Sequence, residues 1–241
     1  MKFIYIFFSF ISLSLSASTV IYSSNYIDVI NLTEIKNSSI VINDNKITSI
    51  KKGFIQLLDD DVLIDLRGMT LMPGFMDMHV HFGQEYVSKA ERPAKVERET
   101  SAILATSHAL KTLKAGFTTV RQVGDSGMVA ISLRDTINSG KIIGPRIFTS
   151  GKSIATTGGH ADHTNGLSSD SYTYPTAEDG VINGPYEAYT AVRQRYKDGA
   201  DGIKLTVTGG VLSVAKSGDN PQFTIEEVDS IVKAAKDYGM W

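Results

Sequence analysis

The sequence predicts an α/β protein: the first half of a (β/α)8 TIM barrel, preceded by a smaller β-rich region. After residue 72, short apolar runs typical of strands alternate with helical patterns, and this alternation favours a parallel sheet. The length of each repeat suits the βα units of a barrel. Residues 19–72 instead contain short strand-like runs and no helical period. A whole barrel takes roughly 250 residues, whereas the region after Met72 accounts for only four strands and four helices.

The first residues are typical of an export signal. Lys2 precedes an apolar run over 3–15, and small residues at 16–18 suit a cleavage site. The run is shorter than the roughly 20 apolar residues that span a bilayer. We therefore expect residues 1–18 to be a signal peptide and the protein to be periplasmic or extracellular, with no stable membrane span after cleavage. A buried N-terminal strand or a signal anchor is the alternative.

The β-rich region contains three clear strand patterns. The runs 39–42 and 46–50 flank Asn43-Asp44-Asn45, which is typical of a hairpin turn. Residues 62–66 form another strand pattern, and Arg67-Gly68 is expected to close it.

The barrel region follows a repeated strand and helix pattern. A capping box, Thr224 with Glu227, is expected to open the last helix, and Gly239 to stop it near Tyr238. The other expected elements are a strand through Phe75–His81, a helix over 94–114 ended by Gly116, a strand over 117–120, a helix over 128–137, a strand over 146–150, a helix over 186–196 followed by Gly199, and a strand over 202–208.

The composition narrows the possible functions. The chain has no cysteine, which excludes disulfides, thiolate metal ligands and a cysteine nucleophile. The net charge is −2 with acids and bases interleaved, so no basic stripe indicates nucleic acid as a partner. Any metal must be held by nitrogen and oxygen ligands, which suits Zn, Mn, Fe or Co.

Two histidines separated by one residue end the first barrel strand. Residues i and i+2 of a strand point to the same face, so His79 and His81 aim two imidazoles at one point. Imidazole is the commonest metal ligand among side chains. Two of them on a strand predict half of a divalent-metal site. Two surface histidines without a metal are the alternative.

Lys204 lies in the middle of the predicted strand over 202–208, between Ile203 and Leu205. Strands of a parallel barrel are buried on both faces, and burial favours the neutral amine of a lysine. A neutral amine can add carbon dioxide and form a carbamate, an anion with two oxygen atoms. A lysine that extends to solvent at a strand end is the alternative.

A long polar loop follows the strand over 146–150. It begins with Ser153-Ile154-Ala155-Thr156-Thr157-Gly158-Gly159-His160-Ala161-Asp162-His163 and continues to about Asn183. Loops of this length are often functional, and this one leaves the carboxyl end of a barrel strand, where barrel active sites lie. His160 and His163 are therefore candidate binding residues, or loop histidines that cap backbone groups. His108, within a helix, is expected to be a packing or surface residue.

The run Pro73-Gly74-Phe75-Met76-Asp77-Met78-His79-Val80-His81 resembles the first-strand signature of the amidohydrolase superfamily, metal-dependent hydrolases built on a (β/α)8 barrel. The resemblance implies that His79 and His81 bind metal, and that a carbamate on Lys204 bridges two divalent ions, expected to be zinc. It also implies that residues 19–72 are the N-terminal part of a β-sandwich, with the barrel occupying 73–241.

The resemblance also implies an activity. The stretch T-T-G-G-H-x-D is similar to the branch of prolidase-like dipeptidases and imidazolonepropionase-related enzymes, in which His160 would face the substrate; His163 is the second candidate substrate-binding residue. A metal-bridging hydroxide would attack an amide carbonyl. The implied substrates are small molecules: amides or dipeptides, with Xaa-Pro dipeptides first and cyclic amides as the alternative. A homo-oligomer is possible.

The sequence departs from the family pattern in what it lacks. The family adds histidines near the ends of strands five and six and a proton-transferring aspartate after strand eight, but no histidine follows His163. We therefore expect an N-terminal fragment that holds metal ligands, contains no catalytic residue of its own and is inactive alone. A secreted binding protein of the same fold is the remaining alternative.

Overall fold

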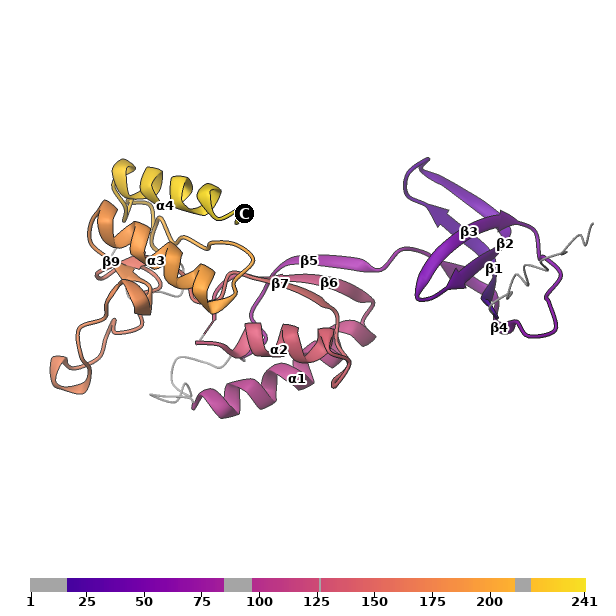
Figure 1. Ribbon diagram of the computed structural model, residues 1–241, viewed down its shortest axis with the longest axis horizontal. Helices are drawn as coiled ribbons and strands as arrows, with labels where there is room; N and C mark the ends of the chain where they lie inside the picture. Colours follow the sequence, from indigo (N-terminus) through magenta and orange to yellow (C-terminus); the bar gives the residue numbers. More distant parts are fainter. Residues whose placement is uncertain (1–16, 85–96, 126, 211–217) are drawn as a thin grey trace, which may run out of the picture. The chain divides into compact units, whose positions relative to one another are not determined.

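The computed structural model divides the chain into two compact units, residues 1–73 and 74–241 (Figure 1). The predicted signal peptide lies outside the described residues, apart from its last two positions. None of the helices in the described parts of the chain is long and apolar enough to cross a membrane. The structure describes residues 17–84, 97–125, 127–210 and 218–241.

The first unit is a four-stranded sheet with the order β3-β2-β1-β4. β1 pairs with β2 antiparallel and with β4 parallel, and β2 pairs with β3 antiparallel. Val20 of β1 and Ile40 of β2 are the apolar side chains that this sheet buries most deeply. The strands are β1 (Thr19–Asp28), β2 (Thr33–Asn43), β3 (Lys46–Lys52) and β4 (Val62–Leu71).

The predicted hairpin is confirmed, and the predicted end of β4 is wrong. Asp44 and Asn45 connect β2 to β3 with φ values of 48° and 64°, the backbone that a two-residue hairpin turn requires. β4 continues through Arg67 and Gly68, because Gly68 adopts a φ of 94° and lets the strand bulge. Pairing with β1 then resumes at Thr70. The β-sandwich assignment of this unit stays a prediction.

The second unit contains a parallel three-stranded sheet, β5-β6-β7. The predicted alternation of strands and helices is confirmed here. Residues 94–96, the predicted start of the first helix, lie outside the described residues. The elements are β5 (Phe75–Val80), α1 (Arg98–Lys114), β6 (Phe117–Gln122), α2 (Val129–Asn138) and β7 (Arg146–Thr149).

One face of this sheet is covered by α1 and α2 (Figure 1). Val80, at the end of β5, packs against the cluster that joins them. The opposite face of β5 is therefore free to carry a site. The buried members of the cluster are Phe82, Ala105, Ala109, Val120, Val129, Leu133 and Ile147.

The predicted fourth strand over 202–208 does not form a continuous ladder. Asp201 N donates to Thr149 O, but pairing resumes only at Ile154, through an isolated parallel bridge to Leu205. The interruption arises because the chain turns at Gly151, where φ is 59°. The segment still lies beside β7 in the order that a barrel requires.

The long loop after β7 is partly structured, and two helices follow it. The predicted capping box is confirmed, because Thr224 accepts from Glu227 N and the Glu227 side chain accepts from Thr224 N. A second apolar cluster joins the two helices to the loop. The elements are β8 (Ala155–Thr156), η1 (Ser169–Ser171), η2 (Ala177–Asp179), β9 (Val181–Ile182), α3 (Pro185–Asp198) and α4 (Ile225–Asp237).

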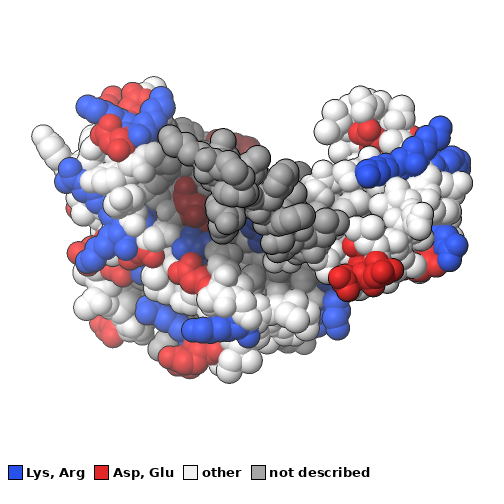
Figure 2. All heavy atoms as spheres, turned by 45° about the vertical axis from the view of Figure 1, so that its right-hand side comes forward, with Lys and Arg blue, Asp and Glu red and all other residues white. Residues whose placement is uncertain are grey.

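Charged side chains of both signs are interspersed on the face drawn in Figure 2. On this face, neither sign covers a continuous area. This distribution agrees with the net charge of −2.

Candidate metal centre

The site is built at the C-terminal end of β5, within the second unit. Val80 faces the helix-covered side of the sheet, so His79 projects from the opposite side. His81 follows the last residue of the strand. Both imidazoles are exposed to solvent, which leaves them accessible to a ligand.

The two imidazoles converge. Nε2 of His79 and Nε2 of His81 are 3.2 Å apart. A tetrahedral zinc ion with Zn–N bonds of about 2.0–2.1 Å separates two ligand nitrogens by about 3.3–3.4 Å. The observed pair is therefore already close to the spacing that one metal ion requires.

A backbone carbonyl sets the tautomer of His81. Nδ1 of His81 lies 3.2 Å from Gly124 O, and a carbonyl only accepts, so Nδ1 is the donor. Neutral His81 then carries its lone pair on Nε2, the form that binds metal. Gly124 has a φ of 118°, and a Cβ there would lie 2.7 Å from Ser153 Oγ and 3.4 Å from His81 Cε1. The close approach therefore requires glycine.

Lys204 lies in the segment next to β7, close enough for its charge to act on His79. It is half-buried, and its backbone O accepts from Ile154 N at 2.8 Å. The pKa of His79 is lowered from its usual 6.5, first by partial desolvation and then by the positive charge of Lys204. Lys204 is thus a near neighbour of His79, and His79 favours its neutral, metal-binding form.

The protein supplies two imidazoles and one lysine at this point. Among the described residues, no group of three or more His, Asp or Glu side chains is arranged to hold a metal. An ammonium is not a metal ligand, whereas a lysine carbamate would add oxygen ligands and negative charge. The donor set fits a divalent metal only in that modified form.

The loop histidines lie after β7 and do not form a matching pair. Both His160 and His163 are exposed. The ring of His160 packs closely against Gly210. A Cβ on that glycine would lie only 2.2 Å from Cε1 of the ring, so the contact leaves no room for a side chain at position 210. His163 follows the buried Asp162 in the sequence, and the pKa of the Asp162 carboxyl is lowered, against the effect of burial, mainly by hydrogen bonds from Gly158 and Thr164.

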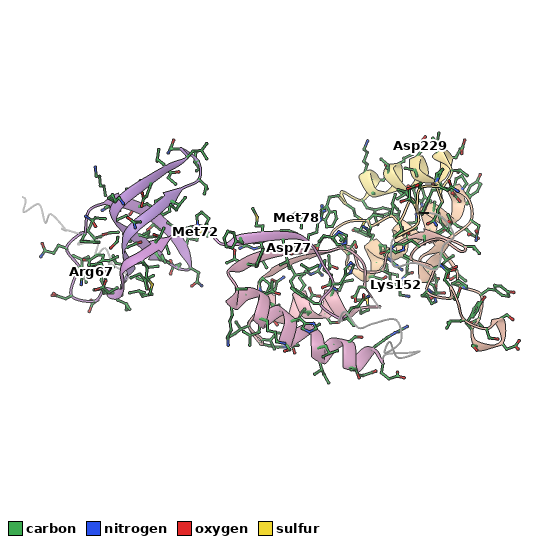
Figure 3. The ribbon with its side chains drawn as sticks, turned by 180° about the vertical axis from the view of Figure 1, so that it is seen from behind. Arg67, Met72, Asp77, Met78, Lys152 and Asp229 are labelled. Atoms are coloured by element: carbon green, nitrogen blue, oxygen red, sulfur yellow. The ribbon has the colours of Figure 1, made fainter. Side chains whose placement is uncertain are left out.

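Asp162 organises the loop that carries them. Its carboxylate accepts from Gly158 N at 2.8 Å and from Thr164 N and Oγ1 at 2.9 and 2.7 Å. Lys152, labelled in Figure 3, ties the start of the loop to its later part, because its Nζ lies 3.6 Å from Oδ1 of Asp179 in η2. The candidate substrate-binding residues, His160 and His163, thus lie on a loop that is held by hydrogen bonds to Asp162.

His108 is a packing residue, as expected, because its Nδ1 bonds to Phe82 O at 2.7 Å. Sequence reasoning missed Arg121, Gln122 and Gly124 around the site. An arginine and a glutamine at the end of the β6 pattern were the available signal for the first two, since parallel strands are usually apolar on both faces. Gln122 is buried, and its Oε1 accepts from Phe82 N at 3.3 Å.

The comparisons with known proteins identify the family of the chain. Residues 70–241 match the model of the Amidohydrolase family. A crystal structure of a Xaa-Pro dipeptidase with bound methionine in the active site is 68% identical, with a TM-score of 0.90 over 93% of this chain and 55% of that one. A prolidase complexed with N-methylphosphonate-L-proline is 29% identical, with a TM-score of 0.81 over the same shares.

A curated relative gives the same picture. The ochratoxinase of Aspergillus niger is 29% identical over 182 residues, which cover 70% of this chain and 37% of that protein. The crystal structure of A. niger ochratoxinase has a TM-score of 0.76. The chain thus spans about half the length of the similar solved structures, and less of the curated relative.

Proposed function

The chain belongs to the amidohydrolase family, and we propose that the whole protein is a metal-dependent hydrolase of C–N bonds in small amides. The observation that carries the proposal is the convergence of His79 and His81, 3.2 Å apart at Nε2, beside Lys204. The family match covers all three residues.

His79, His81 and a carbamate on Lys204 would hold two divalent ions, with zinc as the expected metal. The lysine ammonium first loses one proton, and addition of carbon dioxide to the neutral amine then releases a second proton, so the two steps together replace a cation by an anion. That change offsets the positive charge around His79, where Lys204 and Arg121 both lower the pKa. When bound, the ions would lower the pKa of water and polarise an amide carbonyl.

A Xaa-Pro dipeptide is the proposed substrate. The dipeptidase at 68% identity and the prolidase with a proline-containing phosphonate both support a dipeptide over a cyclic amide. His160 and His163 stand on the loop after β7 and would contact the substrate. We also propose that residues 1–18 direct export of the protein and are then removed.

The test measures metal and hydrolysis together. The whole protein is stripped with a chelator and reconstituted with zinc and bicarbonate. We expect about two ions per chain by elemental analysis, and hydrolysis of Xaa-Pro dipeptides that disappears on chelation and returns with zinc. Cyclic amides serve as the competing substrate class.

Two results would contradict the proposal. Metal binding without hydrolysis of either substrate class would favour a secreted binding protein of this fold. Hydrolysis that survives chelation would place the chemistry on other groups.

A further inference from the structure

The strand that carries the histidines is irregular at the site. Asp77 pairs with Val120 of β6 and Val80 pairs with Gln122, so two residues of β5, Met78 and His79, lie opposite the single residue Arg121. This is a β-bulge, and a bulge leaves backbone groups without ladder partners. The peptide between Met78 and His79 is therefore one that the sheet itself does not hold.

Two side chains hold that peptide instead. Nε of Arg121 donates to Met78 O at 2.9 Å, and Oδ1 of Asp77 accepts from His79 N at 3.0 Å. The two bonds engage the C=O and the N–H of the same peptide. Asp77 and Met78 are adjacent on β5 (Figure 3), whereas Arg121 belongs to the neighbouring strand β6.

The arginine is itself held in place. Its guanidinium lies 5.3 Å from the ring centroid of Trp241. The backbone of Trp241 accepts from Ile203 N at 2.9 Å, so Arg121 stands between β5 and the segment that carries Lys204. Rotation of the Met78–His79 peptide would turn the His79 ring away from His81, since φ of His79 is one of its two backbone dihedrals.

We propose that Asp77 and Arg121 are positioning residues that clamp the Met78–His79 peptide and so set the 3.2 Å spacing of the two imidazoles. The inference rests on the proposed metal site. It assigns to these two residues no contact with substrate. The clamp requires an acceptor at position 77 and a donor at position 121, and it does not require the negative charge of Asp77.

The test uses paired variants. Asp77→Ala and Arg121→Met remove one bond each, Asp77→Asn keeps an acceptor, and Arg146→Met changes an exposed arginine of β7 as the control. Affinity for Co²⁺ and its visible spectrum are measured by titration. We expect roughly tenfold weaker binding and an altered spectrum for the first two variants, as for other residues that orient metal ligands, and wild-type behaviour for the other two.

A second measurement separates this inference from the proposed function. The ¹⁵N chemical shifts of the His79 and His81 side chains are recorded in metal-free protein, because the contact between their Nε2 atoms changes the shifts of both nitrogens. If the wild type binds no Co²⁺, the proposed function fails and the shifts alone judge the clamp. Wild-type shifts in both Asp77→Ala and Arg121→Met would overturn it. The clamp would also be overturned if Asp77→Asn changed the histidine shifts as much as Asp77→Ala does. If Arg121→Met does not fold, the comparison of these two Asp77 variants decides.

Discussion

The second unit carries two pairs of histidines that are built in different ways. His79 and His81 stand at the end of a strand, two residues apart, and their Nε2 atoms are 3.2 Å apart. His160 and His163 stand three residues apart in a loop, where one ring packs on Gly210 and the other lies near Asp162. A strand fixes the direction of alternate side chains, whereas a loop positions each one separately. The first arrangement suits a chelating ion, and the second suits separate contacts to a larger ligand.

The largest expected effect tests this division directly. Replacing His79 and His81 together with alanine should reduce bound zinc to background, because both converging nitrogens are lost. Replacing His160 and His163 together with alanine should leave the metal content unchanged. Both double variants are compared with the wild type by elemental analysis after dialysis. Equal loss of zinc from the two would mean that the loop pair also binds metal.

The next effect concerns the third member of the strand site. Lys204→Ala should weaken zinc binding by up to about 100-fold, the upper range for losses around a metal site, because the carbamate cannot form. Short carboxylic acids added to this variant should restore part of the binding, since they supply the missing oxygen ligands. Isothermal titration with and without acetate measures both. Lys152→Ala, which removes a lysine paired with Asp179, is the control; a similar loss there would argue against a specific role.

The smallest effect lies in the loop and appears in stability rather than metal content. Burial acts to raise the pKa of Asp162, but hydrogen bonds from Gly158 and Thr164 lower it by more than burial raises it. The native pKa therefore lies below its usual value of 3.8. Asp162→Ala should destabilise the protein by about 1–3 kcal/mol at neutral pH, because donors are left unpaired. Metal binding should not change.

The stabilisation that Asp162 provides should decrease as the pH falls. A carboxyl with a lowered native pKa stabilises above its unfolded pKa, and this contribution is lost as the pH falls through the native value. The wild type should therefore approach Asp162→Ala in unfolding free energy as the pH falls below 3.8, the usual pKa of an aspartate, measured by denaturant titration. Asp170→Ala, in the exposed turn η1, should follow the wild type. A constant gap over this range would show that the charge of Asp162 is not involved.

Most of the fold follows from local patterns. The strands β5, β6 and β7 and the helices that follow them were predictable, because apolar period and end signals lie within each segment. The segment 202–208 has an equally strong strand pattern, yet a ladder also needs an uninterrupted partner, and the turn at Gly151 removes it. The continuation of β4 past Gly68 depended in the same way on pairing with β1.

In the site, too, the features set by local sequence were predictable and those set by contacts between segments were not. The convergence of His79 and His81 was predictable, because a two-residue period is a local property. The roles of Arg121 and Gly124 were not, because they depend on the register between β5 and β6 and on the approach of Ser153. A register shift of one residue moves every side chain to the other face, and the sequence of one strand does not contain that information.

Lys204 and the two histidines also differ in how firmly their backbones are held. The segment 202–208 is joined to its neighbours by isolated bridges and single backbone hydrogen bonds in place of a continuous ladder, and segments held in this way open locally more often than the whole protein unfolds. Formation of the proposed carbamate requires dissolved carbon dioxide to reach the lysine amine. Transient opening of this segment provides a route, while β5 stays paired. The rate of activation of newly made protein would then be governed by the breathing of one short segment and by the bicarbonate supply of its compartment.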